Sequence, residues 1–101
     1  MSMQSELLSL KNLGNTSINW LKAIGINSYD ELKSVGPVEA YTKIKQRHIK
    51  VSKVFLYALH GALTNTHWND LAPSLKEQLV AEAEQRLQEQ QSNDDQTLQH
   101  P

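Results

Sequence analysis

The stretch from Leu10 to Leu21, LKNLGNTSINWL, constrains the fold of this chain more than any other. One short apolar-periodic segment ends at Leu10, and a second runs from Ile18 to Ile24. The residues between them include two asparagines, a glycine and two hydroxyl residues, which are the types that turn a chain and cap a helix. The pattern therefore predicts a helix, a tight hairpin and a second helix that begins near Asn15.

The start of this second helix is predicted to attract an anion. Free backbone N–H groups and the helix dipole both favour negative charge there, and Lys11 lies at the mouth of the turn. The arrangement resembles the helix-hairpin-helix motif, whose turn binds a nucleic-acid phosphate through backbone amides. Gly14 stands at the second glycine position of that motif, whereas Asn12 replaces the first and has to tolerate a left-handed backbone. The resemblance implies these candidate nucleic-acid-binding residues: Lys11, Asn12, Gly14, Asn15 and Thr16.

A longer set of motifs resembles the C-terminal domain of the TfoX/Sxy family, bacterial regulators of natural competence and their relatives. The motifs are LKNLGNTSINWLKAIGINSYDELKSVGPVEAYTKIK, LYALHGAL and HWNDL, and the resemblance extends over residues 10–87. It implies an all-α, SAM-like bundle of five or six short helices that contains a helix-hairpin-helix element. Full-length members add a separate N-terminal domain, so we expect a stand-alone C-terminal domain. The hairpin also resembles the C-terminal domain of the RNA polymerase alpha subunit, which indicates fold alone.

The net charge of −1 conceals a division along the chain. Residues 11–53 carry eight basic side chains against three acidic ones, and residues 54–101 carry two basic against seven acidic. This division favours a surface for an anionic partner, or it reflects solvated helices of different composition. The cluster that could make salt-dependent, sequence-independent phosphate contacts consists of Lys43, Lys45, Arg47, Lys50 and Lys53. The alternative is that these residues form a solvated connection between helices.

Length and composition exclude several classes of protein. A chain of 101 residues makes one domain, and 39% apolar residues allow a small core. Without cysteine there is no disulfide or thiolate ligand, which favours a reducing compartment. No apolar run is long enough to span a membrane, and the first ten residues lack the pattern of a signal peptide. We therefore expect a cytoplasmic protein, and a bacterial one by its resemblance.

Start and stop signals predict the helices that flank the hairpin and follow it. A first helix of about two turns is expected over Met3–Leu10. Gly25 and the apolar residue after it predict a Schellman stop. Ser28 and the glutamate three residues later form a capping box, which opens a short helix that ends at Gly36. Pro37 then fits the first position of the next helix.

The second half of the chain contains the most apolar predicted helix. Ser52 is expected to cap a helix over Lys53–Leu63, which should be the buried central helix. Gly61 costs that helix about 1 kcal/mol relative to alanine, which a close helix crossing would offset. Pro73 begins the last helix, whose apolar residues recur at intervals of four: Leu75, Leu79, Ala83 and Leu87.

The chain turns strongly polar after this last apolar stripe. Residues 88–101 consist mostly of Gln, Asn, Asp and Ser, with almost nothing to bury. We expect them to form a disordered tail, which leaves residues 1–87 as the folded domain.

Side chains with catalytic potential lack convergent partners. His60 and His67 are seven residues apart, with no cysteine or clustered carboxylate beside them, so we expect a packing-edge residue and a turn residue. Thr16 and Ser17 are better explained by helix capping than as nucleophiles. The pattern favours a protein without catalytic activity, cofactor or metal.

Two functions remain as predictions from the sequence. As the resemblance implies, the chain is expected to be a regulatory module that contacts duplex DNA or a protein of the transcription machinery. The alternative is a protein–protein interaction adaptor in which the hairpin is purely structural. Trp20 and Trp68 could stack on bases, but core positions are favoured for both. The sequence leaves the target sequence and the oligomeric state open.

Overall fold

In the computed structural model, five α-helices and one short 3₁₀ helix make up most of the described part of the chain from residue 9 to residue 99. The model describes residues 7 and 9–99, and the side chains of these residues up to residue 89. The elements in order are α2 (Asn15–Ala23), α3 (Tyr29–Val35), α4 (Pro37–Gln46), α5 (Lys53–Thr64), η1 (Trp68–Asp70) and α6 (Pro73–Gln99). This part of the chain contains no strand, so the predicted all-α fold class is confirmed.

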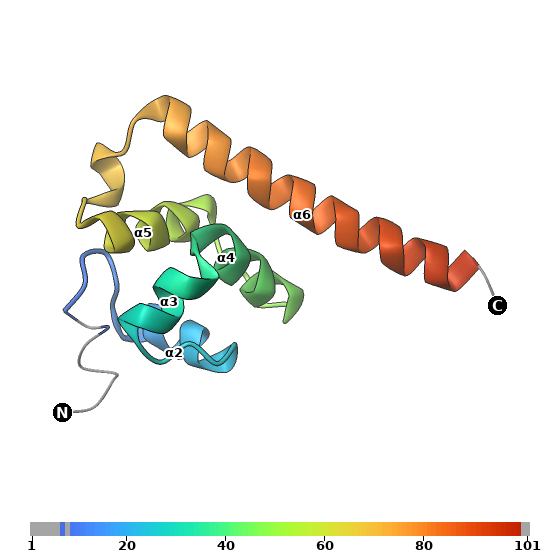
Figure 1. The fold of residues 1–101 in the computed structure, drawn as a ribbon, viewed down its shortest axis with the longest axis horizontal. Coiled ribbons are helices and arrows are strands. Elements are labelled where there is room, and N and C mark those ends of the chain that lie inside the picture. Colours follow the sequence, from blue (N-terminus) through green and yellow to red (C-terminus); the bar gives the residue numbers. More distant parts are fainter. Residues whose placement is uncertain (1–6, 8, 100–101) are drawn as a thin grey trace.

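Helices α4 and α5 lie at the centre of the fold. α4 packs against α2, α3, α5 and α6, and α5 packs against α3, α4, η1 and α6. In Figure 1, α2 and α3 lie on one side of this central pair, and α6 crosses the other side and continues beyond it. The central position predicted for residues 53–63 is therefore confirmed, but α4 shares it.

The core draws leucine and isoleucine side chains from both halves of the chain. The largest fully buried side chains are Leu7, Ile18, Leu21, Leu32, Ile44, Leu56 and Leu59. On α6, Leu79 and Ala83 are buried, whereas Leu75 and Leu87 are only partly so. The apolar stripe predicted for the last helix thus packs on the core through its two middle residues.

Two glycines end helices where the sequence predicts stops. At Gly25 (φ +85°) the stop is a complete Schellman motif, because the Gly25 N–H donates to the Lys22 carbonyl and the Ile26 N–H donates to the Leu21 carbonyl. Gly36 joins α3 to α4 with φ +88° and ψ 160°, a backbone region that only glycine adopts readily. Both borders are confirmed.

The predicted capping box opens α3. The Ser28 Oγ accepts a hydrogen bond from the Glu31 N–H at 3.2 Å. The Glu31 carboxylate reaches one residue further back than a standard box requires and accepts from the Asn27 N–H at 3.1 Å. The first bond satisfies a donor that a helix start leaves free, and the second satisfies the N–H of the residue before the N-cap.

Some predicted features differ from the structure, and one lies mostly outside the described residues. Most of the helix predicted over Met3–Leu10 lies outside the described residues. Gly14 is the N-cap of α2 and no side chain caps that helix, so the capping role predicted for Thr16 and Ser17 is wrong. Ser52 occupies the predicted N-cap of α5 without a side-chain hydrogen bond to it.

The last helix also extends further than its apolar stripe. Its backbone is helical as far as Gln99, whereas the predicted folded domain ends at residue 87. The separation of a domain over residues 1–87 from a tail over 88–101 stays a prediction. Within the described part of the chain, no helix is both long and apolar enough to cross a membrane.

Candidate nucleic-acid interface

Five predicted cations lie where α4 ends and α5 begins. We call Lys43, Lys45, Arg47, Lys50 and Lys53 the basic corner. All five side chains are exposed. Lys45 and Lys53 line the same hollow, so the end of α4 and the start of α5 are neighbours in space. The structure therefore brings Lys45 and Lys53 together, whereas Lys43 lines a separate groove between α4 and α6.

None of these cations pairs with a carboxylate among the described residues. The ion pair in this part of the chain joins Arg86 to Glu39 and involves no residue of the corner. Lys45 places its Nζ 5.4 Å from the centre of the Tyr41 ring, a contact that leaves its charge in place. The corner thus presents five exposed cations without an ion pair to a described carboxylate.

The start of α5 adds to the positive potential of the corner. Lys53 is the first residue of that helix, where the dipole disfavours a cation by about 0.3–1 kcal/mol. The first turn holds no acidic residue, and no side chain caps it. The dipole of α5 and the charge of Lys53 therefore have the same sign at this end of the helix.

The hairpin residues lie at a different place. Lys11, Gly14, Asn15 and Thr16 are exposed, and the first turn of α2 has neither an acid nor a side-chain cap. In Figure 1 the loop before α2 and the end of α4 lie on opposite sides of the fold. The structure therefore does not join the hairpin candidates and the basic corner into one surface.

Asn12 faces inward rather than toward a bound phosphate. Its φ of +73° confirms the predicted left-handed backbone. Its Nδ2 donates to the Thr66 carbonyl at 2.9 Å and to the Ala58 carbonyl at 3.4 Å. Its Oδ1 accepts from the Trp68 N–H at 3.2 Å. This side chain connects the hairpin to the segment after α5, a role that the sequence did not suggest.

Gly61 makes room for this connection. A Cβ at that position would collide with the Thr66 carbonyl oxygen and would lie 2.5 Å from the Asn12 Nδ2. The predicted close approach at Gly61 is confirmed, but the neighbours are a loop carbonyl and the hairpin, so the predicted crossing of two helices is wrong.

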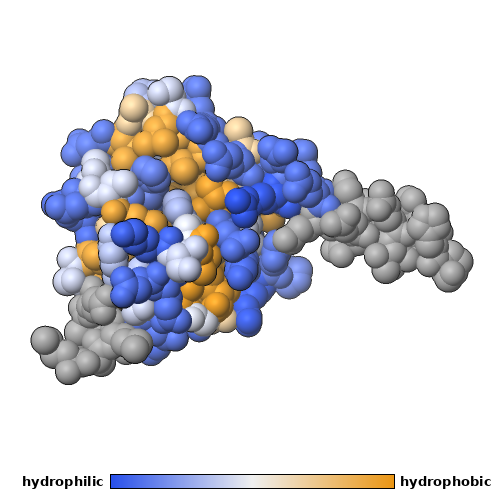
Figure 2. All heavy atoms as spheres, viewed as in Figure 1, coloured by the Kyte–Doolittle hydropathy of each residue, from blue (hydrophilic) through white to orange (hydrophobic). Residues whose placement is uncertain are grey.

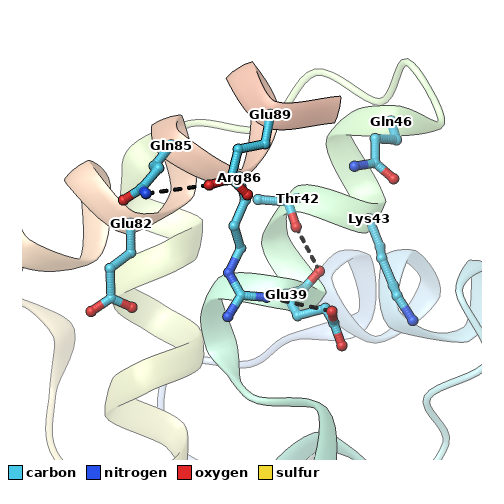
Figure 3. Close-up of a pocket in the computed structure, with 8 residues that line it drawn as sticks. All are labelled: Glu39, Thr42, Lys43, Gln46, Glu82, Gln85, Arg86 and Glu89. Carbon is cyan, nitrogen blue, oxygen red and sulfur yellow. Dashed lines mark hydrogen bonds and ion pairs between the residues drawn. The ribbon is translucent and has the colours of Figure 1, made fainter. Parts of the chain in front are cut away.

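A polar groove of about 590 Å³ lies between α4 and α6 (Figure 3). Inside it, the Arg86 Nη1 is 3.4 Å from the Glu39 Oε1, and the Gln85 Nε2 donates to Glu89. Its lining is Glu39, Thr42, Lys43, Gln46, Glu82, Gln85, Arg86 and Glu89. Sequence patterns missed this groove because it exists only once α6 lies across α4.

A neighbouring hollow of about 340 Å³ shares Glu39, Glu82 and Arg86 with this groove. Its lining includes Val35, Val38, Leu75 and Leu79, and Figure 2 shows apolar surface in the angle between α6 and the helices beneath it. The half-buried His60 also lines this hollow, as its predicted place at a packing edge implies.

The two tryptophans have different environments. Trp20 packs against the core and meets the Phe55 ring edge-on, with 5.0 Å between the ring centres, so its predicted core position is confirmed. Trp68 is partly exposed and lies outside the core cluster, so the prediction for this residue is wrong. It stacks on His67, a turn residue as predicted.

The described residues contain no group of three or more His, Cys, Asp or Glu side chains placed to hold a metal ion. His67 uses its Nδ1 to accept a hydrogen bond from the Asn69 N–H at 3.2 Å.

Comparisons with known proteins identify relatives without a described activity. Residues 3–83 match the family model of the TfoX C-terminal domain. A crystal structure of an uncharacterized protein from Listeria monocytogenes, in a triclinic form, is 36% identical, with a TM-score of 0.68 over 72% of this chain and 83% of that one. A protein of unknown function from the same organism, in a tetragonal form, is 34% identical, with a TM-score of 0.71 over 79% and 98%. No curated protein matches the sequence.

The family match and both crystal structures agree with the helical fold described above. Because the matched region covers most of the chain, this protein belongs to the TfoX C-terminal domain family.

Proposed function

We propose that this chain is a non-catalytic regulatory module that contacts the phosphates of duplex DNA through the basic corner. The observation that carries the proposal is the set of five exposed cations at the junction of α4 and α5, none of which forms an ion pair with a described carboxylate. The family is a regulatory type of domain and not a known family of enzymes, which supports the regulatory part of the proposal.

The acidic side chains of α6 restrict how a duplex could approach. Glu84 lines the hollow that also contains Lys45 and Lys53, and Glu82 and Glu89 are exposed on the same helix. Like charges repel a phosphate backbone, so Glu84 would oppose phosphate contacts at Lys45 and Lys53. Arg47 and Lys50 line neither of the hollows that contain the other corner lysines, so they would meet the duplex most readily. Lysine and arginine contacts to phosphate position a protein without reading sequence, so this binding would be sequence-independent.

The test is a titration of labelled duplex at about 50 and 200 mM salt, followed by fluorescence anisotropy. Each lost phosphate contact should lower the slope of log affinity against log salt by about 0.9, so Lys45→Glu with Lys50→Glu should lower it by about 1.8. The control Lys33→Glu reverses an exposed charge on α3, outside the corner, and should retain the wild-type slope. Wild-type protein that leaves the duplex unshifted at the lower salt would refute the proposal.

A second candidate function is the protein-interaction adaptor, favoured by the two hollows along α6 that share Glu39, Glu82 and Arg86. The smaller hollow has an apolar lining, and the larger groove contains three glutamates beside Lys43 and Arg86. Together they suit a partner segment that carries apolar and basic residues. The adaptor predicts no duplex binding at low salt. It also predicts that Glu82→Lys, and not Lys45→Glu, weakens capture of the protein partner.

A further inference from the structure

An aromatic pair at the 3₁₀ helix η1 lies outside the hydrophobic core. The rings of His67 and Trp68 stack with 5.9 Å between their centres and 28° between their planes. His67 is exposed and Trp68 is half-buried. This arrangement contrasts with Trp20, which lies edge-on against Phe55 at the core.

Positive charge lies beside this aromatic pair. The Lys76 Nζ is 5.5 Å from the centre of the Trp68 ring and also 5.5 Å from the centre of the Tyr57 ring. Lys11 is exposed on the hairpin, next in sequence to the Asn12 that bonds Trp68. Asp70 is the acidic residue of η1. Lys76 and His67 both lie against the Trp68 ring, which disfavours a cationic ligand there. A flat ligand would therefore stack on the exposed His67 ring, with Trp68 behind it.

Hydrogen bonds hold the His67 ring and the backbone of Trp68. The His67 Nδ1 accepts from the Asn69 N–H at 3.2 Å, and the Trp68 backbone N–H donates to the Asn12 Oδ1 at 3.2 Å. Since the His67 ring is already held, stacking a flat ligand on it requires little further ordering of the protein.

We propose that His67 and Trp68 form a stacking site for an unpaired nucleobase, with Lys76 and Lys11 facing the phosphates on either side of that base. Exposed aromatic rings combined with cations are the features with which proteins bind single-stranded nucleic acid. A base inside a duplex has both faces covered by its neighbours and offers no face to this ring pair. The ligand is therefore a single-stranded segment or an unstacked base, distinct from the duplex that the basic corner would contact.

This inference rests on the proposed function only in taking nucleic acid as the partner. The probe is a fluorescein-labelled oligothymidylate of about 12 nucleotides, within the range that single-strand sites cover. The readouts are its anisotropy and the quenching of tryptophan fluorescence. Trp68→Leu should weaken binding about tenfold, within the usual range for loss of one base–aromatic stack.

His67 allows a matched pair of variants that separates stacking from turn stability. His67→Asn removes the ring but keeps a side-chain oxygen that can accept from the Asn69 N–H, and it should weaken binding about fivefold or more. His67→Phe keeps a ring and loses that acceptor, and it should retain most of the affinity. Asn69→Ala changes an exposed side chain of the same turn and should bind as wild type does.

The outcomes distinguish this inference from the proposed function. If oligothymidylate binding depends on His67 and Trp68 while wild-type protein leaves duplex unbound, the stacking site stands and the duplex proposal fails. If oligothymidylate affinity is unchanged by Trp68→Leu and His67→Asn but falls with Lys45→Glu and Lys50→Glu, the stacking site is refuted. A loss in His67→Phe as large as or larger than the loss in His67→Asn would also refute it, because the ring at position 67 would then not determine affinity.

Discussion

Asn12 and Gly61 act together at the scale of single residues. The Asn12 amide bonds two backbone carbonyls and one backbone N–H of the segment from Ala58 to Trp68. The missing side chain of Gly61 leaves space for that amide and for the Thr66 carbonyl. The hydrogen bonds of Asn12 require glycine at position 61, because a larger side chain there would occupy the space of the amide.

The hydrogen bonds of Asn12 predict an order among its variants. Asn12→Gly suits the positive φ but leaves partly buried polar groups unpaired, so it should destabilise the fold by about 1–3 kcal/mol. Asn12→Ala loses the same bonds and also strains the backbone, which should cost about 1 kcal/mol more. Chemical denaturation measures both values. Equal stability of Asn12→Gly and wild type would show that these bonds contribute nothing.

Replacement by alanine should lower stability to different extents at two glycines. Gly61→Ala brings a methyl group into contact with the Thr66 carbonyl and should destabilise by about 1–3 kcal/mol, despite the better helix propensity of alanine. Gly14→Ala adds a methyl group with nothing within 4 Å, at an extended φ of −118°, so only the poorer N-cap preference of alanine should cost stability, by about 0.5–1 kcal/mol. The denaturation midpoints of the two variants test this contrast. A stabilised Gly61→Ala would contradict the packing described here.

At the scale of elements, α5 and α6 bury different numbers of side chains in the core. α5 buries six residues along its length, whereas α6 docks through Leu79 and Ala83. The ion pair between Arg86 and Glu39 adds little to the docking of α6, because both side chains are nearly half exposed and solvent screens them. Apolar contact therefore decides where both helices lie.

α5 offers a matched pair of core and surface substitutions. Leu59→Ala removes a fully buried side chain and should destabilise the fold by about 2–5 kcal/mol. Val54→Ala changes a side chain that is 41% exposed on the same helix and should cost less than about 0.5 kcal/mol. Urea unfolding of both variants checks the difference. Similar losses would mean that the buried face of α5 is assigned incorrectly.

The end of α6 should be dispensable for folding. Truncation after Leu87 keeps the apolar stripe and the Arg86–Glu39 contact, and it removes residues with almost nothing apolar to bury. We expect the free energy of unfolding to change by less than about 0.5 kcal/mol. Thermal melting followed by circular dichroism measures the change. A loss comparable to that of Leu59→Ala would show that residues 88–101 pack on the domain.

At the scale of the whole molecule, charge and shape separate two surfaces. The basic corner lies at the junction of α4 and α5, and the hairpin loop lies on the opposite side of the fold (Figure 1). The exposed acidic side chains of α6 form a boundary to the corner. A partner held at the corner is therefore expected to leave the hairpin and η1 free.

This separation predicts independent effects of charge reversal. Lys11→Glu should leave duplex affinity within about twofold of wild type, while Lys45→Glu with Lys50→Glu lowers it, and the combined variant should show the sum of the separate effects. With oligothymidylate, Lys11→Glu should weaken binding. Anisotropy titrations of all three variants test this. A Lys11→Glu variant that lowers the duplex salt slope as much as the corner variant would place both regions on one binding surface.

The local features of this fold were determined by the sequence alone, because each depends on a few neighbouring residues. Gly25 and Gly36 ended helices as predicted, since their backbone angles disfavour other residues. Ser28 and Glu31 marked the start of α3, and Pro37 marked the start of α4. The exposed state of the basic corner also followed from composition, since lysine and arginine are rarely buried without partners.

The tertiary structure alone decided which distant groups meet. Asn12 lies 54 positions from Thr66, so no local pattern could assign its amide to that carbonyl. The groove along α6 and the exposure of Trp68 depend on how α6 and η1 pack against α4 and α5. The hairpin and the basic corner both carry positive charge in sequence, yet the packing of helices places them on opposite sides. Helix caps and glycine turns depend on neighbouring residues, so the sequence predicts them. The surfaces that a partner would meet form only when distant helices pack around the core.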